Sequence, residues 1–427
     1  MEYAFFLIVL ILCIANFQFN HGQFVKPSML YISTLAMAVG VYLTAFGKWE
    51  VNLSGVACAI MIIGFSMFWL GESLSCFLYQ YFHKNSTGME RNQVILKMPL
   101  IVNIIVLCMC VITIYLSFNK MMDFISLANI NSDSDTALAG VRYAKLMGEK
   151  TGIILALLTI ILSAVGFIYQ VLFFNDLIIG HKIMPLYFIF SICGILPGLF
   201  FASRYPLINY FIQCIAIIAV MQQWKYDWHY TIRFRDIVLI LFAIALCLSV
   251  FLLMGTFTGK VDANTVISAL QVYIASPVQG VDIVIANENY YMEEYPGEVI
   301  FARFYDLLFR LGIIDNLAAY AYPFLSAGRL VTNIYSANGD WFILAGLPGV
   351  IVGQFFVGAV LGWIYSYLKH CSNINLVFVF YFYIAQAYFG RIWAEKIFNV
   401  VFDFMFIIVL ICWVIIWKFV NKEKCTS

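Results

Sequence analysis

Arginines are the residues of this sequence best suited to chemistry, because most of the chain is apolar and cannot bind a charged group. Arg204 lies in the short stretch Ser203-Arg204-Tyr205-Pro206, between two apolar runs. A guanidinium binds phosphate through paired hydrogen bonds, and the proline marks a helix start whose free N–H groups also favour an anion. Arg204 is therefore a candidate ligand for a lipid phosphate. The alternative is an arginine that anchors a span at the membrane surface.

A second set of arginines lies in a long, less apolar segment late in the chain. Arg303 and Arg310 flank Asp306, and the spacing predicts a helix over 298–313 that carries these side chains on one face. Arg329 follows in the same segment. Acids and tyrosines are also frequent there, and they suit sugar hydroxyls and sugar rings. A salt-bridged surface helix and an aromatic belt at the membrane surface are the structural alternatives.

The remaining candidates are one basic connection and one carboxylate inside an apolar run. Arg142, Lys145 and Lys150 lie close together in the connection over 119–150. They predict either a second basic clamp for an anion or a solvated helix face. Glu72 lies within an apolar run, where a charge is costly and is a functional candidate by default. A satisfied contact inside a helix bundle is the alternative for Glu72.

The composition places these residues in a membrane protein. Of the 427 residues, 63% are hydrophobic and 11% are charged, whereas a soluble domain is roughly one quarter charged. The net charge of +1 and the lack of a compact basic cluster give no indication of a nucleic-acid partner. The 11 cysteines lie in apolar runs or short connections, so neither a disulfide framework nor a zinc site is expected. We expect no metal and no cofactor.

We expect an all-α polytopic membrane protein with about eleven transmembrane helices, since a span needs about 20 mostly apolar residues. Residues 1–257 would hold a first bundle of about eight helices, 258–340 one large extracytoplasmic loop with short helices, and 341–427 the last three helices and a short tail. The aromatic and branched residues of the loop predict a folded lid. Glycines between Gly346 and Gly362 predict close helix packing. The candidate spans are 2–18, 28–46, 54–82, 98–118, 151–174, 183–202, 206–222, 237–257, 341–368, 374–392 and 397–419.

The distribution of cations orients the predicted spans. Lysines and arginines are more frequent in the connections that share a side with the carboxyl terminus, so we predict that terminus in the cytoplasm and the amino terminus in the periplasm. The large loop then faces the periplasm, and all 5 histidines face the cytoplasm. An outward excess of arginine alone indicates a face that holds an anion. The arginines predicted outside are Arg142, Arg204, Arg303, Arg310, Arg329 and Arg391.

Short motifs at the two ends of the loop resemble those of a known family. Thr332-Asn333-Ile334-Tyr335 and then Gly346-Leu347-Pro348-Gly349 lead out of the loop. Tyr273-Ile274-Ala275-Ser276-Pro277 and Val281-Asp282 lead into it. Together with Ser203-Arg204 and the many predicted spans, these motifs resemble the Wzy-type oligosaccharide repeat-unit polymerases, which are also called O-antigen polymerases.

The resemblance implies a metal-independent glycosyltransferase of the inner membrane. It would polymerise oligosaccharide repeat units carried on undecaprenyl diphosphate into a surface polysaccharide such as O-antigen. The lipid bilayer, a chain-length regulator and a flippase are the further partners that it implies. Fixed arginines would stabilise the anionic leaving group in the transition state. The assigned catalytic residues are Arg204, Arg303 and Arg329, and the assigned substrate-binding residues are Arg142, Arg310, Asp282, Asn333 and Tyr335.

Two other functions remain open at this point. An O-antigen ligase shares the layout of many spans and a large loop, but that family uses a histidine in the outer loop, and our topology places none there. A transporter or flippase of lipid-linked glycan needs basic residues inside the bundle, whereas these arginines lie in connections. The sequence also departs from the polymerase pattern at Leu344, where the family often has an aspartate. Asp340 lies nearby and has no assigned role.

Overall fold

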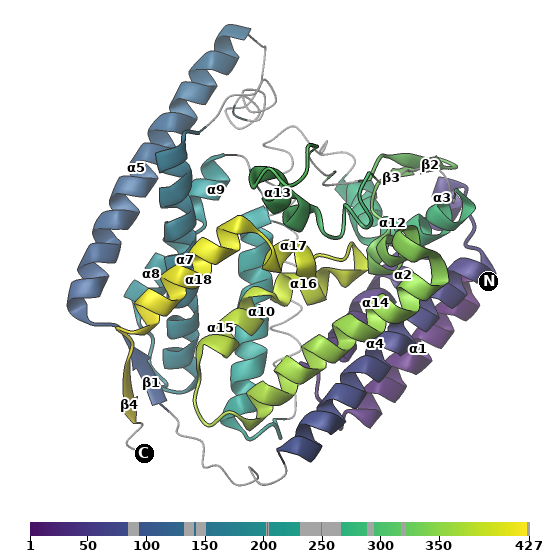
Figure 1. Ribbon diagram of the computed structural model, residues 1–427, viewed down its shortest axis with the longest axis horizontal. Helices are drawn as coiled ribbons and strands as arrows, with labels where there is room; N and C mark the ends of the chain where they lie inside the picture. Colours follow the sequence, from purple (N-terminus) through teal and green to yellow (C-terminus); the bar gives the residue numbers. More distant parts are fainter. Residues whose placement is uncertain are drawn as a thin grey trace. The chain divides into compact units, whose positions relative to one another are not determined.

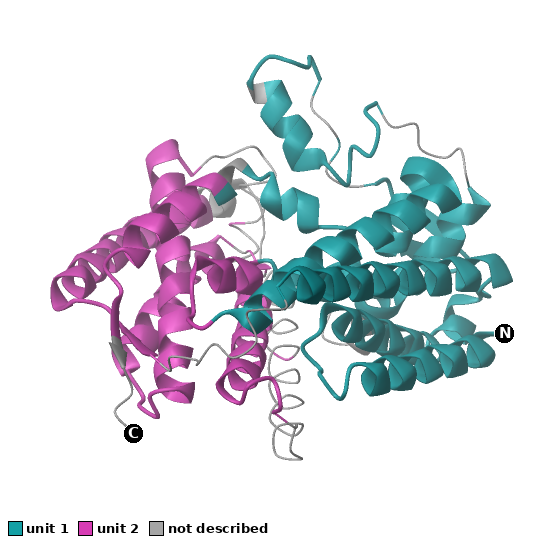
Figure 2. Cartoon of the chain, turned by 60° about the horizontal axis from the view of Figure 1, so that its bottom comes forward, with its two compact units in different colours: residues 1–89, 267–371, 384–406 teal, residues 90–266, 372–383, 407–427 magenta. Residues whose placement is uncertain are grey.

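The computed structural model is mostly helical (Figure 1). It describes residues 1–83, 94–131, 151–201, 205–230, 266–287, 294–316 and 322–424, together with the single residues 141, 203, 249 and 319. The chain forms two compact units, each assembled from segments that are distant in sequence (Figure 2). Unit 1 comprises residues 1–89, 267–371 and 384–406, and unit 2 comprises residues 90–266, 372–383 and 407–427.

Unit 1 is a bundle of apolar helices with several shorter elements. Its long helices are α1 (Glu2–Phe19), α2 (Pro27–Tyr42), α4 (Gly55–Phe82), α12 (Val266–Ala286) and α14 (Ser336–His370). Its short elements are α3 (Phe46–Trp49), α13 (Ala302–Arg310), β2 (Leu325–Ala327), β3 (Leu330–Thr332), α16 (Ala385–Phe389), η3 (Gly390–Ile392) and α17 (Ile397–Val401). Strands β2 and β3 pair antiparallel, with Leu325 opposite Thr332.

Helices α4 and α14 pack at very close range through glycines, as the sequence predicts. A Cβ atom on Gly358 would lie 2.1 Å from the carbonyl oxygen of Phe68, and one on Gly71 would lie 2.1 Å from that of Phe355. Only glycine leaves room for such an approach of two backbones. The predicted structural role of the small residues in α14 is therefore confirmed.

Helix α14 is broken near its beginning. Ala345 has φ −153° and ψ 27°, and Gly346 has φ 63° and ψ −151°, which no residue with a side chain adopts easily. Pro348 follows at the start of the second part, where its missing N–H group is not needed. The break sets the first part of the helix, residues 336–344, at an angle to the long second part that packs on α4.

Contacts define two ends of unit 1. At one end, the N–H of Leu53 donates to Glu2 at 3.1 Å and that of Arg329 donates to the carbonyl of Trp49 at 2.8 Å. The amino terminus, the turn over 43–54 and the β2–β3 hairpin therefore lie together. At the other end, the rings of Tyr79 and His370 lie 5.3 Å apart. Within unit 1 the hairpin and His370 therefore lie at opposite ends, and which end faces the cytoplasm stays a prediction.

Unit 2 is a second group of apolar helices. It contains α5 (Leu100–Asn131), α7 (Ile153–Ile178), α8 (Pro185–Cys193), α9 (Leu196–Phe200), α10 (Tyr205–Lys225), α15 (Leu376–Tyr383) and most of α18 (Phe404–Trp417). Trp413 in α18 donates a hydrogen bond from its indole to the carbonyl of Ala164 in α7 at 3.2 Å. Strands β1 (Val94–Lys97) and β4 (Asn421–Lys424) pair antiparallel and join the start of this unit to the end of the chain.

Six of the described helices are long and apolar enough to cross a membrane. They are Glu2–Phe19, Gly55–Phe82, Leu100–Ser126, Ile153–Ile178, Tyr205–Lys225 and Ser336–His370. Shorter apolar helices cover Pro27–Tyr42, Pro185–Phe200, Gln271–Ala286, Leu376–Ile392 and Phe406–Trp417. A helical membrane protein is therefore supported, whereas the predicted count of about eleven spans is not confirmed. The predicted span over 237–257 lies outside the described residues.

The segment predicted as one large loop differs from that prediction at both ends. It contains the 21-residue helix α12, which is longer than the short helices expected. Ala275, Val278 and Val281 of α12 have no exposed surface, because their helical spacing lets them pack into unit 1. Helix α14 begins at Ser336, before the predicted end of the loop at residue 340. The described residues between these helices, 294–316 and 322–335, form α13 and the β2–β3 hairpin.

Candidate functional site

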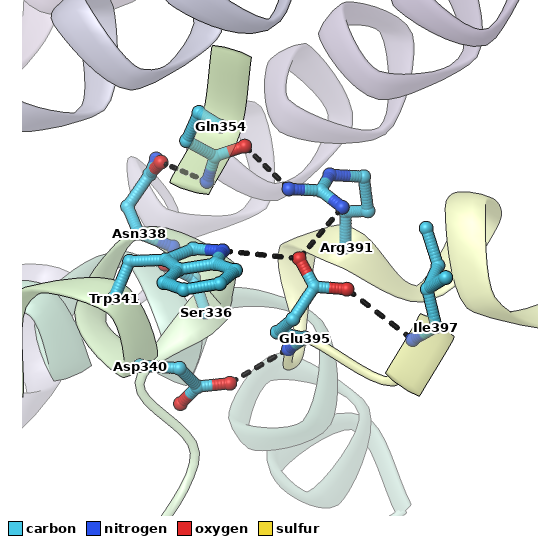
Figure 3. Close-up of polar contacts among 8 residues, drawn as sticks. All are labelled: Ser336, Asn338, Asp340, Trp341, Gln354, Arg391, Glu395 and Ile397. Carbon is cyan, nitrogen blue, oxygen red and sulfur yellow. Dashed lines mark hydrogen bonds and ion pairs between the residues drawn. The ribbon is translucent and has the colours of Figure 1, made fainter. Parts of the chain in front are cut away.

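The candidate site lies where α14 begins, and its centre is a buried ion pair (Figure 3). Nη1 of Arg391 lies 2.8 Å from Oε2 of Glu395, and neither side chain is exposed. Arg391 belongs to η3, and Glu395 follows four residues later, just before α17. Taking two charges out of water costs several kcal/mol for each ion, so such a pair persists only when further hydrogen bonds satisfy both groups.

Both carboxylate oxygens of Glu395 accept hydrogen bonds. The indole N–H of Trp341 donates to Oε2 at 3.2 Å, and the backbone N–H of Ile397 donates to Oε1 at 3.2 Å. The second bond caps the first turn of α17. The backbone N–H of Glu395 in turn donates to Oδ2 of Asp340 at 2.6 Å. Glu395 is therefore held by the first part of α14 through both its side chain and its backbone.

Arg391 is held by amides and aromatic rings. Its Nη2 donates to Oε1 of Gln354, and Nε2 of Gln354 donates to Oδ1 of Asn338 at 2.6 Å. The guanidinium carbon lies 4.8 Å from the ring centre of Phe68 and 5.4 Å from that of Tyr31, both favourable cation–π distances. Nε of Arg391 has no hydrogen-bond partner among the described residues.

This network joins the two parts of the broken helix. Asn338, Asp340 and Trp341 lie before the break in α14, and Gln354 lies after it. The indole of Trp341 packs on Gly353, where a Cβ atom would lie 2.2 Å from the ring. Because Arg391 and Glu395 are inaccessible, they cannot contact a substrate in this conformation. Their function is to fix the turn over 391–397 against α14, and so to position the residues on α17.

Two accessible cations flank α17. The backbone N–H of Arg303 donates to Oδ1 of Asn399 at 3.2 Å, and Nδ2 of Asn399 donates to the carbonyl of Val299 at 2.9 Å. Figure 1 accordingly places α13 next to α17. Nε of Arg303 lies 3.5 Å from Asp403, which follows α17, and its side chain is 40% exposed. Lys396 precedes α17 and reaches solvent.

The surroundings of Lys396 weaken its hold on a proton. Although the side chain reaches solvent, desolvation by the surrounding protein lowers the pKa of its ammonium, and the nearby carboxylate of Asp340 acts in the opposite direction. An anion bound beside this ammonium would favour its charged form. Arg303 and Lys396 are therefore the described residues best placed to meet a phosphate near α17.

Arg329 lies in the turn of the β2–β3 hairpin, and its ion-pair partner belongs neither to α13 nor to α17. Its Nη2 lies 2.5 Å from Oε1 of Glu50, and its side chain is 71% exposed. Arg303 and Asp306 lie 4.0 Å apart, which is the ion pair of the structural alternative. The structure thus holds both arginines in ion pairs and leaves parts of both exposed, but it ties them to different elements. Arg303 and Arg329 share no ion-pair partner.

Three other predicted substrate-binding residues make contacts inside the protein. Asp282 accepts from the N–H of Ser54 at 3.2 Å and from Gln279 at 3.1 Å, and thereby holds the start of α4. Tyr335 is buried and its hydroxyl donates to the carbonyl of Pro323 at 2.7 Å. Nδ2 of Asn333 donates to the carbonyl of Tyr322 at 3.4 Å. These contacts give all three residues a structural role, and none of them tests a role in binding.

The other predicted residues lie beyond what the structure describes. Arg142 and Arg204 are outside the described residues, as are Lys145 and Lys150. Arg310 ends α13, and its side chain is likewise not described. Their predicted roles therefore stay predictions.

Sequence reasoning missed the centre of the site. Arg391 was predicted only as one of the outward arginines. A usable signal was present, because Arg391 and Glu395 stand four apart in a short connection between apolar runs, the spacing of a helical ion pair. No comparable signal connects Arg391 to Gln354 or Asn338, since these contacts cross between separate helices.

No metal centre is apparent in the part of the chain that the structure describes, where no group of three or more histidine, cysteine, aspartate or glutamate side chains is placed to hold an ion. No protein-family model, curated protein or solved structure matches this chain. Its function therefore has to be argued from its own residues and their arrangement.

Proposed function

We propose that this protein is a glycosyltransferase that polymerises lipid-linked oligosaccharide repeat units. The donor is a growing glycan on undecaprenyl diphosphate, and the acceptor is a single repeat unit on the same carrier. The product is a surface polysaccharide such as O-antigen, formed on the periplasmic side of the inner membrane. In this proposal the chain has about eleven spans, with a periplasmic amino terminus and a cytoplasmic carboxyl terminus.

The observation that carries the proposal is the pair of accessible cations on either side of α17. Arg303 and Lys396 are attached to a rigid base, because the buried pair of Arg391 and Glu395 fixes the turn from which α17 starts. They lie in unit 1 with the amino terminus and the β2–β3 hairpin, at the end of α14 that the sequence orients outward. A lipid diphosphate at the headgroup plane is the anion that this position suits.

The chemistry needs charge stabilisation at the leaving group. When the acceptor hydroxyl attacks the anomeric carbon, the bond to the diphosphate oxygen breaks, negative charge grows on that oxygen, and the proton of the hydroxyl passes to the departing diphosphate or to water. Fixed cations lower the barrier if they meet this charge better in the transition state than in the ground state. Binding two large lipid-linked substrates side by side adds a proximity gain. Arg204 and Arg329 remain candidate catalytic residues, and Arg142 and Arg310 candidate binding residues, within this proposal.

The test replaces the accessible cations in cells that make a polymeric surface glycan. Arg303→Ala and Lys396→Ala should each shorten or abolish the polymer while single repeat units remain on the surface. Lys48→Ala is a matched control, because Lys48 is an exposed cation of the 43–54 turn at the same end of unit 1. Membrane levels of each variant are measured by immunoblot, so that loss of activity is separated from loss of protein.

The same cells distinguish the alternatives. Wild-type chain length in both variants would remove the proposed site. In a deletion strain, complete polymer left on the lipid carrier would indicate a ligase, and repeat units trapped in the cytoplasmic leaflet would indicate a flippase. Single repeat units displayed without polymer would support the polymerase.

A further inference from the structure

Helix α13 buries a carboxylate and exposes large apolar side chains. Ala302 and Asp306, one turn apart, are its buried residues. Phe304 is 36% exposed, and Leu308 stands on the same side, one turn later and half-buried. Burying a carboxylate while exposing phenylalanine is the reverse of what water favours on a surface helix. The exposed phenylalanines of α13 therefore suit an apolar environment.

The apolar surface continues past the end of the helix. Leu311 and Ile313 are each 64% exposed. Gly312 between them has φ 69°, a left-handed conformation that ends the helix and turns the chain. Exposing such large aliphatic side chains to water is unfavourable, by about 25 cal/mol per Å² of apolar surface.

A row of aromatic rings joins α13 to the membrane-spanning part of α14. Phe304 lies 5.3 Å from Phe402, Phe402 lies 6.4 Å from Phe398, and Phe398 lies 6.5 Å from Phe356. Phe356 is 52% exposed on α14, one turn after the exposed Val352. α14 is one of the helices long and apolar enough to cross a membrane. The apolar surface of α13 is therefore continuous with the exposed surface of a helix that is able to cross a membrane.

We propose that α13 and residues 311–313 lie in the boundary between the headgroups and acyl chains of the bilayer, with phospholipid acyl chains covering Phe304, Phe309, Leu311 and Ile313. The polar side of the helix agrees with this position, because Arg303 and Asp306 are at the level of Asp403, directly before the apolar helix α18. A helix with aromatic and aliphatic residues on one side and charges on the other has the composition of an interfacial anchor.

The consequence is that α13 is fixed at the depth where lipid headgroups lie. It does not stand free in the aqueous phase as a lid would. This inference does not rest on the proposed function, since a lipid-bound α13 is compatible with a polymerase, a ligase or a transporter.

A photoreactive phenylalanine analogue tests the contact in the full-length protein in native membranes. It is introduced at Phe309 and, in a second variant, at Ile313. The control position is Glu294, an exposed acid of the same segment whose carboxylate accepts a hydrogen bond from Asn316. After irradiation, mass spectrometry of the purified protein should find phospholipid adducts at positions 309 and 313 several-fold above those at position 294.

Each other result overturns the proposal. Lipid adducts no more frequent than at position 294 would place α13 in water. A crosslink to a second copy of the chain, seen as a dimer in denaturing gels, would make the face a self-association surface. A crosslink to another protein would make it a docking site for that protein. Because the analogue replaces exposed side chains, folding of the variants is checked by their yield and by their elution in size-exclusion chromatography.

Discussion

Arg391 and Glu395 form an ion pair that is completely closed to solvent, and the same glutamate accepts a hydrogen bond from the first N–H of α17, beside which the two accessible cations lie. Nη1 and Oε2 of the pair are 2.8 Å apart, and Oε1 accepts from the N–H of Ile397 at 3.2 Å. Stability and the placement of α17 therefore depend on one carboxylate. Substitutions of Glu395 should therefore affect both stability and the position of α17.

Removing one partner of the pair should be strongly destabilising. Glu395→Gln leaves the guanidinium of Arg391 buried without a counter-charge, which costs about 3–5 kcal/mol in comparable sites. We expect a clearly lower midpoint in thermal unfolding of the detergent-purified protein. The double variant Arg391→Leu with Glu395→Leu should recover part of the loss, because it removes both charges.

The control for this experiment is the exposed pair of Arg329 and Glu50. Arg329→Ala should change stability by about 0–1 kcal/mol, as is usual for solvent-exposed ion pairs. Equal loss of stability in Glu395→Gln and Arg329→Ala would contradict the structural role of the buried pair.

Adding a side-chain atom at the contact between α4 and α14 should also destabilise the protein. A Cβ atom in Gly358→Ala would lie 2.1 Å from the carbonyl oxygen of Phe68, so the two helices must move apart. We expect a cost of about 1–3 kcal/mol, typical of overpacking. Gly47→Ala is the matched control, since a Cβ atom there has no neighbour within 4 Å. Unfolding midpoints that fall equally in both variants would argue against backbone contact as the cause.

Variants of Asp282 test whether this residue has a structural role or binds the substrate. Its carboxylate accepts from the N–H of Ser54 at the start of α4. Asp282→Ala should lower stability by about 0.5–2 kcal/mol, the usual cost of a lost helix-start acceptor. Asp282→Asn keeps one acceptor oxygen and should lose less. If polymer length falls in Asp282→Ala while the unfolding midpoint is unchanged, the residue acts on the substrate, as the sequence predicts.

If Lys396 binds the substrate, polymer formation should depend on pH. Because desolvation lowers the pKa of its ammonium, with Asp340 opposing, the cation is lost at a lower pH than that of an ordinary lysine. Polymer formation in isolated membranes should therefore fall on the alkaline side as the pH rises through that pKa. Lys396→Arg keeps its charge, since an arginine is not deprotonated in proteins, and should retain activity to higher pH. The same alkaline limb in wild type and in Lys396→Arg would exclude Lys396 as the titrating group.

The sequence by itself determined the class of the protein and its local features. The apolar composition predicted a helical membrane protein, and the glycine spacing of α14 predicted close packing on a neighbour. The ion pair of Arg303 and Asp306 was the structural alternative that their helical spacing offered, and the structure contains it. Each of these properties depends on residues that are near one another in the chain, where spacing alone decides which side chains meet.

Only the tertiary structure decided which polar residues meet across the fold. It showed Asp282 at the start of α4 and Tyr335 under the hairpin, and it buried Arg391 against Gln354, Tyr31 and Phe68. It also showed that α13 exposes large apolar side chains. These contacts join segments that are far apart in the chain, and no spacing in the sequence specifies them. They are set by which helices pack together, because a charge can be buried only where the fold supplies its partners.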